Sequence, residues 1–460
     1  MRAYLGLFVW MLCLWAGSVQ AGETFRFRVY LKDKGESGYT LDKPREFLSS
    51  EAIARRTRQG IALSPTDLPI AQAYLDTLSA HGGRPILTSK WFATVVVSTP
   101  DSIQGERLAR LSIVDSVKWI WKGEEGADAS PRAESQEKLA PKEKPTRSSY
   151  GYAEKQIQML NGIKLHKAGY RGAGMRIAVI DEGFRHADRM SVFDSLRVLG
   201  MRNVVSPDES VFQDGDHGTK VLSCLAANAP GWIIGTAPDA SYWLIKSEDS
   251  RSEYPIEEDY WTAAVEFADS VGVDVISSSL GYFSFDAKEL NYSQAQLDGK
   301  SALISRAARM AASKGILLFS SAGNEGNGTW KKITFPADAP DIISVGAITH
   351  KKRKSAFSSV GFTADQRVKP DVVALGSGCC VIDPRGDIHY GNGTSFAAPI
   401  LAGLGTCLWQ ALPELTNQEI IRLIQRSASK AKRPDTELGY GIPNMYKAYK
   451  QGRKYVAKRR

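Results

Sequence analysis

The chain has 460 residues, too many for one ordinary hydrophobic core, so two or three domains are expected. Hydrophobic residues make up 43% and charged residues 24%, which is typical of globular proteins and excludes a collagen-like, a mostly disordered or a multi-pass membrane protein. Lys and Arg number 59 against 50 Asp and Glu, giving a formal net charge of +9. This excess is mild for the length. Without a dense basic stripe interleaved with aromatic residues, we expect no nucleic-acid partner.

Residues 1–21 have the pattern of a secretory signal peptide. Arg2 gives a positive start, residues 5–15 are apolar, and Val19 and Ala21 are the small residues that precede a cleavage site. The alternative is an uncleaved N-terminal anchor, but the apolar run is short, and no later segment has the ~18 apolar residues that a membrane span needs. We therefore expect an exported protein without a stable membrane span, which is secreted, periplasmic or associated with the cell envelope.

Residues 22–123 are expected to form a small α/β domain. Strands are predicted at 25–31, 91–98 and 116–122, and helices at 51–59, at 70–81 and just after Pro100. This alternation favours an open sheet with helices on one face. Residues 124–149 differ, because three prolines stand among Glu, Lys, Ala and Ser. Such a segment cannot bury enough apolar surface to offset its chain entropy, and we expect a flexible, cleavable linker.

Residues 150–450 are expected to form a doubly wound α/β domain with a mostly parallel sheet. Near-continuous β-branched and apolar runs predict buried strands at 176–180, 242–246, 274–279, 316–321 and 342–347. Helical stretches at 259–271 and 303–314 lie between them, as right-handed crossovers require. In such sheets functional residues gather beyond the carboxyl ends of the strands. Thr416 and Glu419 form a capping box that opens a late helix, and 451–460 is a basic tail.

Three motifs of the second domain carry reactive side chains. Asp181 directly follows a buried strand, His217 stands where a polar loop becomes an apolar helix, and Ser395 opens a long helix of small residues. Each alone is ordinary, since such residues often cap helices or lie in loops. Together they supply a nucleophile, a base that takes its proton and a carboxylate that orients the base. Asn324, after another buried strand, could donate to an oxyanion together with the Ser395 N–H, although an Asn between glycines is also a common turn residue.

These motifs resemble the subtilisin-like serine peptidases (subtilases). The family's order is found in Asp181-Glu-Gly, His217-Gly-Thr, Ser279-Leu-Gly, Ala322-Gly-Asn324 and Gly393-Thr-Ser395-Phe-Ala-Ala-Pro. The resemblance covers roughly residues 150–450. It implies that Asp181 orients, His217 is the general base, Ser395 is the nucleophile and Asn324 is the oxyanion donor.

The resemblance also implies two walls of a substrate cleft that pair with an extended peptide. These walls are Ser278, Ser279, Leu280 and Gly281 on one side, and Ser321, Ala322 and Gly323 on the other. It implies a secreted, monomeric serine endopeptidase that cuts proteins or peptides through an acyl-enzyme intermediate, with residues 22–123 as a propeptide that inhibits the enzyme within the same chain. No cofactor and no metal site are assigned.

The sequence departs from the family pattern at three positions. Glu182 replaces a hydroxyl residue that often follows the Asp, Lys220 stands where many members have a second His, and Phe396 replaces a frequent Met. None of these changes removes a catalytic group, but Glu182 could alter the charge beside the triad.

Three alternatives stay open. The same triad could serve an esterase or a peptide ligase, or the domain could be a silent scaffold that binds peptides without cutting them. The basic residues of 447–460 could bind an anionic lipid or polysaccharide, although a solvated tail is favoured. Four cysteines follow the signal peptide, and we expect buried thiols rather than a disulfide framework at Cys224, Cys379, Cys380 and Cys407.

Overall fold

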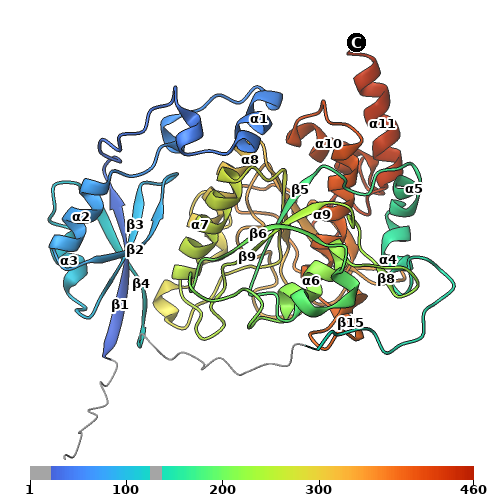
Figure 1. Cartoon of the computed structure of the whole chain (residues 1–460), viewed down its shortest axis with the longest axis horizontal. Coiled ribbons are helices and arrows are strands. Elements are labelled where there is room, and N and C mark those ends of the chain that lie inside the picture. Colours follow the sequence, from blue (N-terminus) through green and yellow to red (C-terminus); the bar gives the residue numbers. More distant parts are fainter. Residues whose placement is uncertain (1–21, 125–136, 460) are drawn as a thin grey trace, which may run out of the picture.

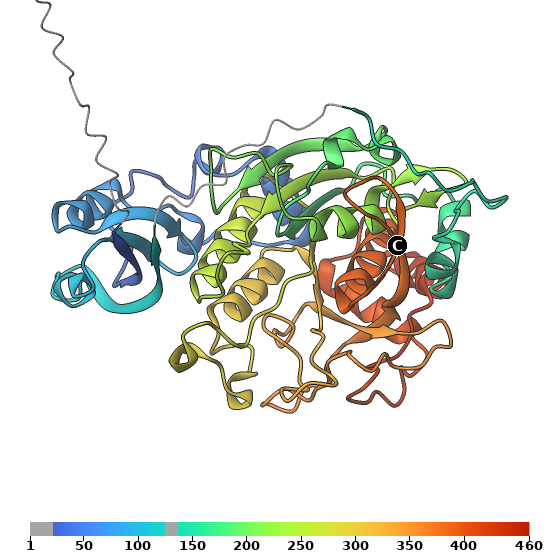
Figure 2. The ribbon, with the colours of Figure 1, turned by 90° about the horizontal axis from the view of Figure 1, so that it is seen from below.

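The computed structural model describes residues 22–124 and 137–459. The predicted signal peptide, residues 125–136 of the predicted linker and Arg460 lie outside the described residues. Two lobes are visible in Figures 1 and 2, a small one built from the first hundred residues and a large one built from the rest.

The small lobe is a four-stranded antiparallel sheet in the order β2-β3-β1-β4. Its strands are β1 (Glu23–Leu31), β2 (Arg84–Ser89), β3 (Thr94–Thr99) and β4 (Val114–Glu124), and its helices are α1 (Ser50–Gln59), α2 (Gln72–Ala80) and α3 (Gln104–Leu108). Helices α2 and α3 cover one face over Phe27, Val29 and Leu108. The alternation of β1 predicted a half-buried strand. Both of its faces are covered, however, because Arg28 on the other face is only 2% exposed, packed against the large lobe.

The large lobe contains a seven-stranded parallel sheet in the order β13-β12-β11-β10-β5-β9-β6. Its strands are β5 (Arg176–Asp181), β6 (Arg197–Asn203), β9 (Ser241–Lys246), β10 (Val275–Ser278), β11 (Leu317–Ser321), β12 (Ile343–Ile348) and β13 (Val372–Leu375). Two short antiparallel pairs complete it, β7 (Asn228–Ala229) with β8 (Ile233–Ile234) and β14 (Ser377–Ile382) with β15 (Ile388–Asn392). The expected α/β class with a mostly parallel sheet is confirmed.

Helices cover both faces of this sheet, and the strands bury alternate side chains in two cores. Ile177 and Val179 of β5 belong to the core under α6 (His217–Ala226) and α9 (Thr394–Gln410). Ala178 and Ile180 belong to the core under α7 (Ile256–Ser270) and α8 (Leu303–Ser313). The remaining helices are α4 (Glu154–Met159), α5 (Gly162–Lys167), α10 (Asn417–Ser427) and α11 (Met445–Ala457), and short 3-10 helices lie at Pro44–Glu46, Pro65–Asp67, Ala187–Arg189, Ser191–Phe193, Lys288–Leu290 and Gln294–Gln296.

The second half of the predicted linker is bound to the large lobe. The N–H of Leu139 donates to the Arg189 carbonyl at 2.9 Å, that of Thr146 to Gly231 at 2.8 Å, and the Trp232 indole to the Glu143 carbonyl at 2.8 Å. These bonds use backbone groups that every sequence has, so composition gave no sign of them. From residue 137 onward, the chain therefore departs from the flexible linker that we expected.

The basic tail is also more ordered than expected, because residues 451–457 continue α11. Gly452 is buried on this helix, and a side chain there would strike Leu412. Arg459 forms an ion pair with Glu419 of α10 at 2.5 Å. The capping box at Thr416 is present as predicted.

Burial of the thiols is confirmed, since Cys224, Cys379, Cys380 and Cys407 are free and buried. Among the described residues, none of the helices combines the length and the apolar character needed to cross a membrane.

Candidate active site

The sheet brings the candidate residues to one edge. Strands β5, β10 and β11 are neighbours and run parallel, so their carboxyl ends lie side by side. Asp181 is the last residue of β5, and Asn324 follows β11 by three residues. His217 is the first residue of α6 and Ser395 the second residue of α9, so both side chains stand at helix N-termini.

Asp181 and His217 are in direct contact. His217 Nδ1 lies 2.7 Å from Asp181 Oδ1, and the carboxylate is fully buried whereas the imidazole is 28% exposed. A bond on Nδ1 leaves Nε2 free to accept a proton, which is the arrangement that a general base needs. The second oxygen of Asp181 is buried and has no hydrogen-bond partner among the described residues.

Glu182 holds the backbone of the same histidine. Its Oε1 accepts the His217 N–H at 2.8 Å, while its own N–H donates to Asp181 Oδ1 at 3.0 Å. Burial by itself would lower the pKa of His217. The charge and hydrogen bond of Asp181, with the charge of Glu182, outweigh that effect and raise the pKa to about 9. The departure from the family pattern at residue 182 therefore acts directly on the predicted base.

Ser395 lies beside this pair but is not bonded to it. Its hydroxyl donates to the Ser279 carbonyl at 3.3 Å, and the Ser279 hydroxyl donates to the Ser395 carbonyl at 2.8 Å. Within the part of the chain that the structure describes, His217 and Ser395 share no hydrogen bond. The imidazole lies near the next residue, with 5.9 Å between the ring centroids of His217 and Phe396. Catalytic hydrogen bonds are often long or misaligned before substrate binds.

Asn324 is oriented by a residue that the motif reading overlooked. Its Oδ1 accepts both the N–H of Thr394 at 2.9 Å and the Thr394 hydroxyl at 3.0 Å. The Thr394 hydroxyl also accepts the Gly323 N–H at 3.2 Å. With Oδ1 occupied, the exposed amide of Asn324 keeps both N–H donors of Nδ2 unused among the described residues. No sequence signal reveals this contact, since Thr394 and Asn324 are 70 residues apart.

The residues of the two predicted walls are mostly buried. Gly281 is exposed, whereas the other six wall residues are buried, namely Ser278, Ser279, Leu280, Ser321, Ala322 and Gly323. The Ser278 hydroxyl accepts the Trp261 indole N–H at 2.9 Å, so this side chain serves the core. Their roles toward a peptide stay predictions.

The comparisons with known proteins agree with this geometry. The model of the subtilase family matches residues 172–441. The chain belongs to the subtilase family. Residues 26–138 match the peptidase S8 propeptide domain of Bacteroidota, so the small lobe is a propeptide domain of this family.

Individual relatives align with a little more than half of the chain. Subtilisin NAT of Bacillus subtilis subsp. natto is 32% identical over 278 residues, which are 59% of this chain and 65% of the relative. Subtilisin of Bacillus pumilus is 31% identical over 278 residues, 59% of this chain and 90% of the relative. The minor extracellular protease Epr of Bacillus subtilis (strain 168) is 28% identical over 297 residues, 63% of this chain and 41% of the relative. The chain thus spans less than two thirds of the length of subtilisin NAT.

No group of three or more His, Cys, Asp or Glu side chains is placed to hold a metal ion within residues 22–124 and 137–459.

Proposed function

We propose that this chain is an exported serine endopeptidase that is made with its own inhibitor. Residues 1–21 are its signal peptide, 22–123 its propeptide and 150–450 its peptidase domain. The observation that carries the proposal is the buried Asp181 carboxylate bonded to His217 at 2.7 Å, beside a serine at the N-terminus of α9.

The proposed reaction begins when Ser395 Oγ turns from the Ser279 carbonyl and attacks a peptide carbonyl. His217 Nε2 takes the hydroxyl proton, and Asp181 stabilises the imidazolium that forms. The C–N bond then breaks, His217 gives the proton to the leaving amine, and an acyl ester remains on Ser395. Water, activated by the same imidazole, releases the acid and restores the serine.

Two donors are available to the oxyanion of the tetrahedral intermediate. Asn324 Nδ2 is one, since Thr394 holds the other end of the amide. The backbone N–H of Ser395 is the second, because the first N–H groups of a helix have no partner within the helix. The Ser395 N–H belongs to helix α9, and the hydrogen bonds from Thr394 of the same helix hold the Asn324 amide beside it.

An inhibitory role of the small lobe is supported by its contact with the large lobe. Trp121, near the end of β4, donates its indole N–H to the Ser252 hydroxyl at 3.2 Å, in the loop between β9 and α7. Because β9 ends at the catalytic edge of the sheet, this contact directs the end of the small lobe toward that edge.

A serine-directed fluorophosphonate probe tests the proposal. Processed wild type should be labelled and should cut a casein or mixed-peptide substrate, whereas the Ser395→Ala variant should do neither while keeping its fold. An esterase or ligase would be labelled but would leave the peptides intact. A silent scaffold would not be labelled, and that result would refute the assignment.

A further inference from the structure

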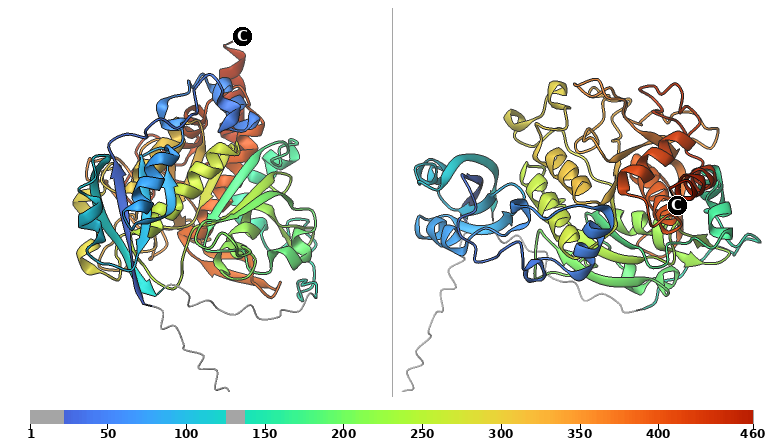
Figure 3. Two further views of the ribbon diagram at one scale, coloured as in Figure 1. Left: turned by 60° about the vertical axis from the view of Figure 1, so that its left-hand side comes forward. Right: turned by 90° about the horizontal axis from the view of Figure 1, so that it is seen from above.

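A long segment of the small lobe leaves its own sheet. Residues 32–71 connect β1 to α2 and contain α1, which lies over the large lobe beside α8 and α10 in Figures 1 and 3. We call residues 32–71 the clamp.

The clamp reaches the edge of the large sheet that is opposite to the catalytic edge. Helices α7 and α8 lead into the amino ends of β10 and β11, so their C-termini lie there. Asp181, His217 and Ser395 stand at the carboxyl ends. Helix α7 has 15 residues, so at about 1.5 Å a residue its two ends are roughly 20 Å apart.

Side chains of α1 donate hydrogen bonds to carbonyl groups just beyond the C-termini of α7 and α8. Arg55 donates to the carbonyls of Val273 at 2.5 Å and Lys314 at 3.2 Å, just beyond α7 and α8. Gln59 donates to the Gly315 carbonyl at 2.7 Å. The last carbonyls of a helix lack partners within it and carry partial negative charge, so an arginine is well suited to them.

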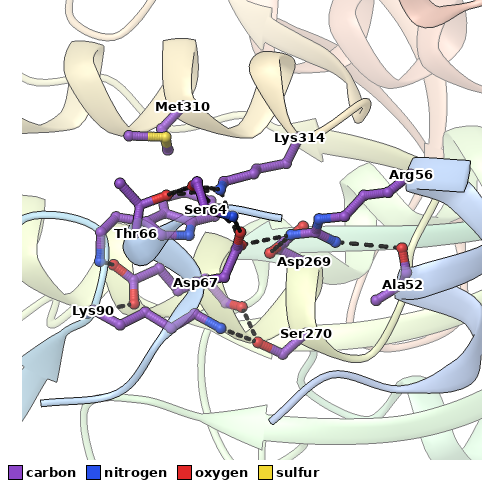
Figure 4. A network of polar contacts seen from close by, with 12 residues as sticks. Ala52, Arg56, Ser64, Thr66, Asp67, Lys90, Asp269, Ser270, Met310 and Lys314 are labelled. Carbon is purple, nitrogen blue, oxygen red and sulfur yellow. Dashed lines mark hydrogen bonds and ion pairs between the residues drawn. The ribbon is translucent and has the colours of Figure 1, made fainter. Parts of the chain in front are cut away.

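A buried network of charges joins the clamp to the same place (Figure 4). Asp269 of α7 pairs with Arg55 and, at 2.7 Å, with Arg56. Asp67 of the clamp pairs with Arg56 at 3.0 Å and with Lys314 of the large lobe at 2.9 Å. None of the five residues is more than 4% exposed. Charges so buried are costly without their partners, so the network specifies one docked position.

The clamp also lies so close to the large lobe that a residue larger than glycine would not fit at position 272. Gly272 follows α7, and a side chain there would lie 2.4 Å from Glu51 Cβ. The N–H of Asn417, the first residue of α10, donates to Gln59 Oε1 at 2.9 Å. The ends of three helices thus form one surface that fits α1.

We propose that this surface is a second docking site for the propeptide, separate from the catalytic cleft. It is an additional contact, made through the clamp, and its buried charges set how slowly the propeptide leaves the peptidase domain after the linker has been cut. The consequence for activity rests on the proposed function, whereas the docking itself does not.

The experiment measures docking in a chain that lacks the proposed nucleophile, so that the result does not depend on activity. The full-length Ser395→Ala chain receives a recognition sequence for a site-specific protease within residues 125–136 and is then cut with that protease. The large fragment is immobilised by a C-terminal tag, and loss of the small fragment is followed over time by mass spectrometry. The small fragment should stay bound through extended washing.

The Arg55→Gln/Arg56→Gln variant should lose its small fragment at least ~100-fold faster, as expected when one side of a buried charge pair is removed. Gln59→Ala, which leaves no charge unpaired, should speed the loss by roughly tenfold. The matched control is Thr57→Ala on the same helix, since the Thr57 side chain is exposed and its hydroxyl donates to the Ile53 carbonyl of α1 itself at 3.0 Å, and its loss should change the rate little.

Two results would overturn the inference. One is a small fragment that leaves the unaltered protein at once, and the other is an unchanged rate of loss in both the arginine and the Gln59 variants. Thermal unfolding of the uncut chains verifies folding, and Gln59→Ala decides the matter if the arginine variant does not fold. If wild type proves inactive while the cut Ser395→Ala chain retains its small fragment, the proposed function fails and the docking site stands.

Discussion

Glu182 offers the sharpest test of the electrostatics of the site. Its carboxylate accepts the His217 N–H at 2.8 Å and contributes to the raised pKa of that histidine, about 9. A general base works only when it is deprotonated, so the hydrolysis rate should rise with pH until it levels near pH 9. In Glu182→Gln the hydrogen-bond acceptor is kept and the charge is lost. The rising limb should therefore move to lower pH.

The size of this shift can be estimated from the charge removed. A unit charge beside a partly exposed imidazole is worth roughly 0.5–1 pKa unit, that is about 0.7–1.4 kcal/mol. The assay is the pH profile of kcat/KM on a short chromogenic peptide from pH 6 to pH 10.5, with Lys220→Gln as the control. Lys220 lowers the pKa of His217, so its loss should move the limb the other way. Identical limbs in all three proteins would refute the reasoning.

Three further predictions follow from the site and the interface. Asn324→Ala should lower turnover by about 10²–10³, a range known for a member of this family, and unchanged single-turnover kinetics would place the oxyanion donor elsewhere. Burial raises the pKa of Glu266 on α7 to about 7. The Glu266 carboxylate accepts the backbone N–H of Lys90 at 2.9 Å and that of Trp91 at 3.1 Å. Docking of the propeptide is therefore accompanied by protonation of Glu266. The cut propeptide should bind more tightly at pH 5 than at pH 8 in a retention assay, and Glu266→Gln should flatten that dependence. Expressed wild type should split near the linker into pieces of roughly 100 and 310 residues, whereas Ser395→Ala stays whole on a gel. A fully active chain that begins at Gly22 would make the small lobe an accessory domain.

The pH dependence of stability follows from the same histidine. Its pKa is raised in the folded chain, from 6.5 to about 9. The stabilisation by the Asp181 pair is therefore complete below about pH 6.5 and is lost as the pH rises through about 9. Activity and this part of the stability thus change in opposite directions with pH.

The catalytic edge could be predicted from the sequence because its residues follow buried strands. Asp181 and Asn324 come directly after apolar runs, and in parallel sheets the ends of such runs meet at one edge. The hydrogen bonds within the site could not be predicted. Nothing in the motif Gly393-Thr-Ser395 says that Thr394 fixes the Asn324 amide, or that Ser395 donates to Ser279, since both contacts join segments 70 or more residues apart.

Edge strands and the clamp escaped prediction for different reasons. In β6, Val198, Leu199 and Met201 are 40–48% exposed, because it is the last strand of the sheet. Its apolar run is only four residues long, includes Gly200 and is flanked by arginines, which is a weak strand signal. Helix α1 was predicted, but nothing in its sequence indicates that Arg55 and Arg56 are buried. Their burial depends on carboxylates of both lobes and on backbone carbonyls of the large lobe, and backbone carbonyls leave no trace in a sequence.

Charges at both ends of α7 explain why the small lobe docks in one orientation. At the start of α7, Arg28 of β1 forms two hydrogen bonds with Asp259, of 2.7 and 2.5 Å, and a third with the Pro255 carbonyl at 3.0 Å. At the far end, Arg55 meets Asp269. Between these points, Val96 and Ile120 bury apolar surface against the large lobe, but apolar contacts alone would let the small lobe slide along α7. Two charged contacts roughly 15 Å apart along α7 do not tolerate it, because any slip leaves buried charges unpaired. The end of β4 is thereby directed to the catalytic edge, which an intramolecular inhibitor requires.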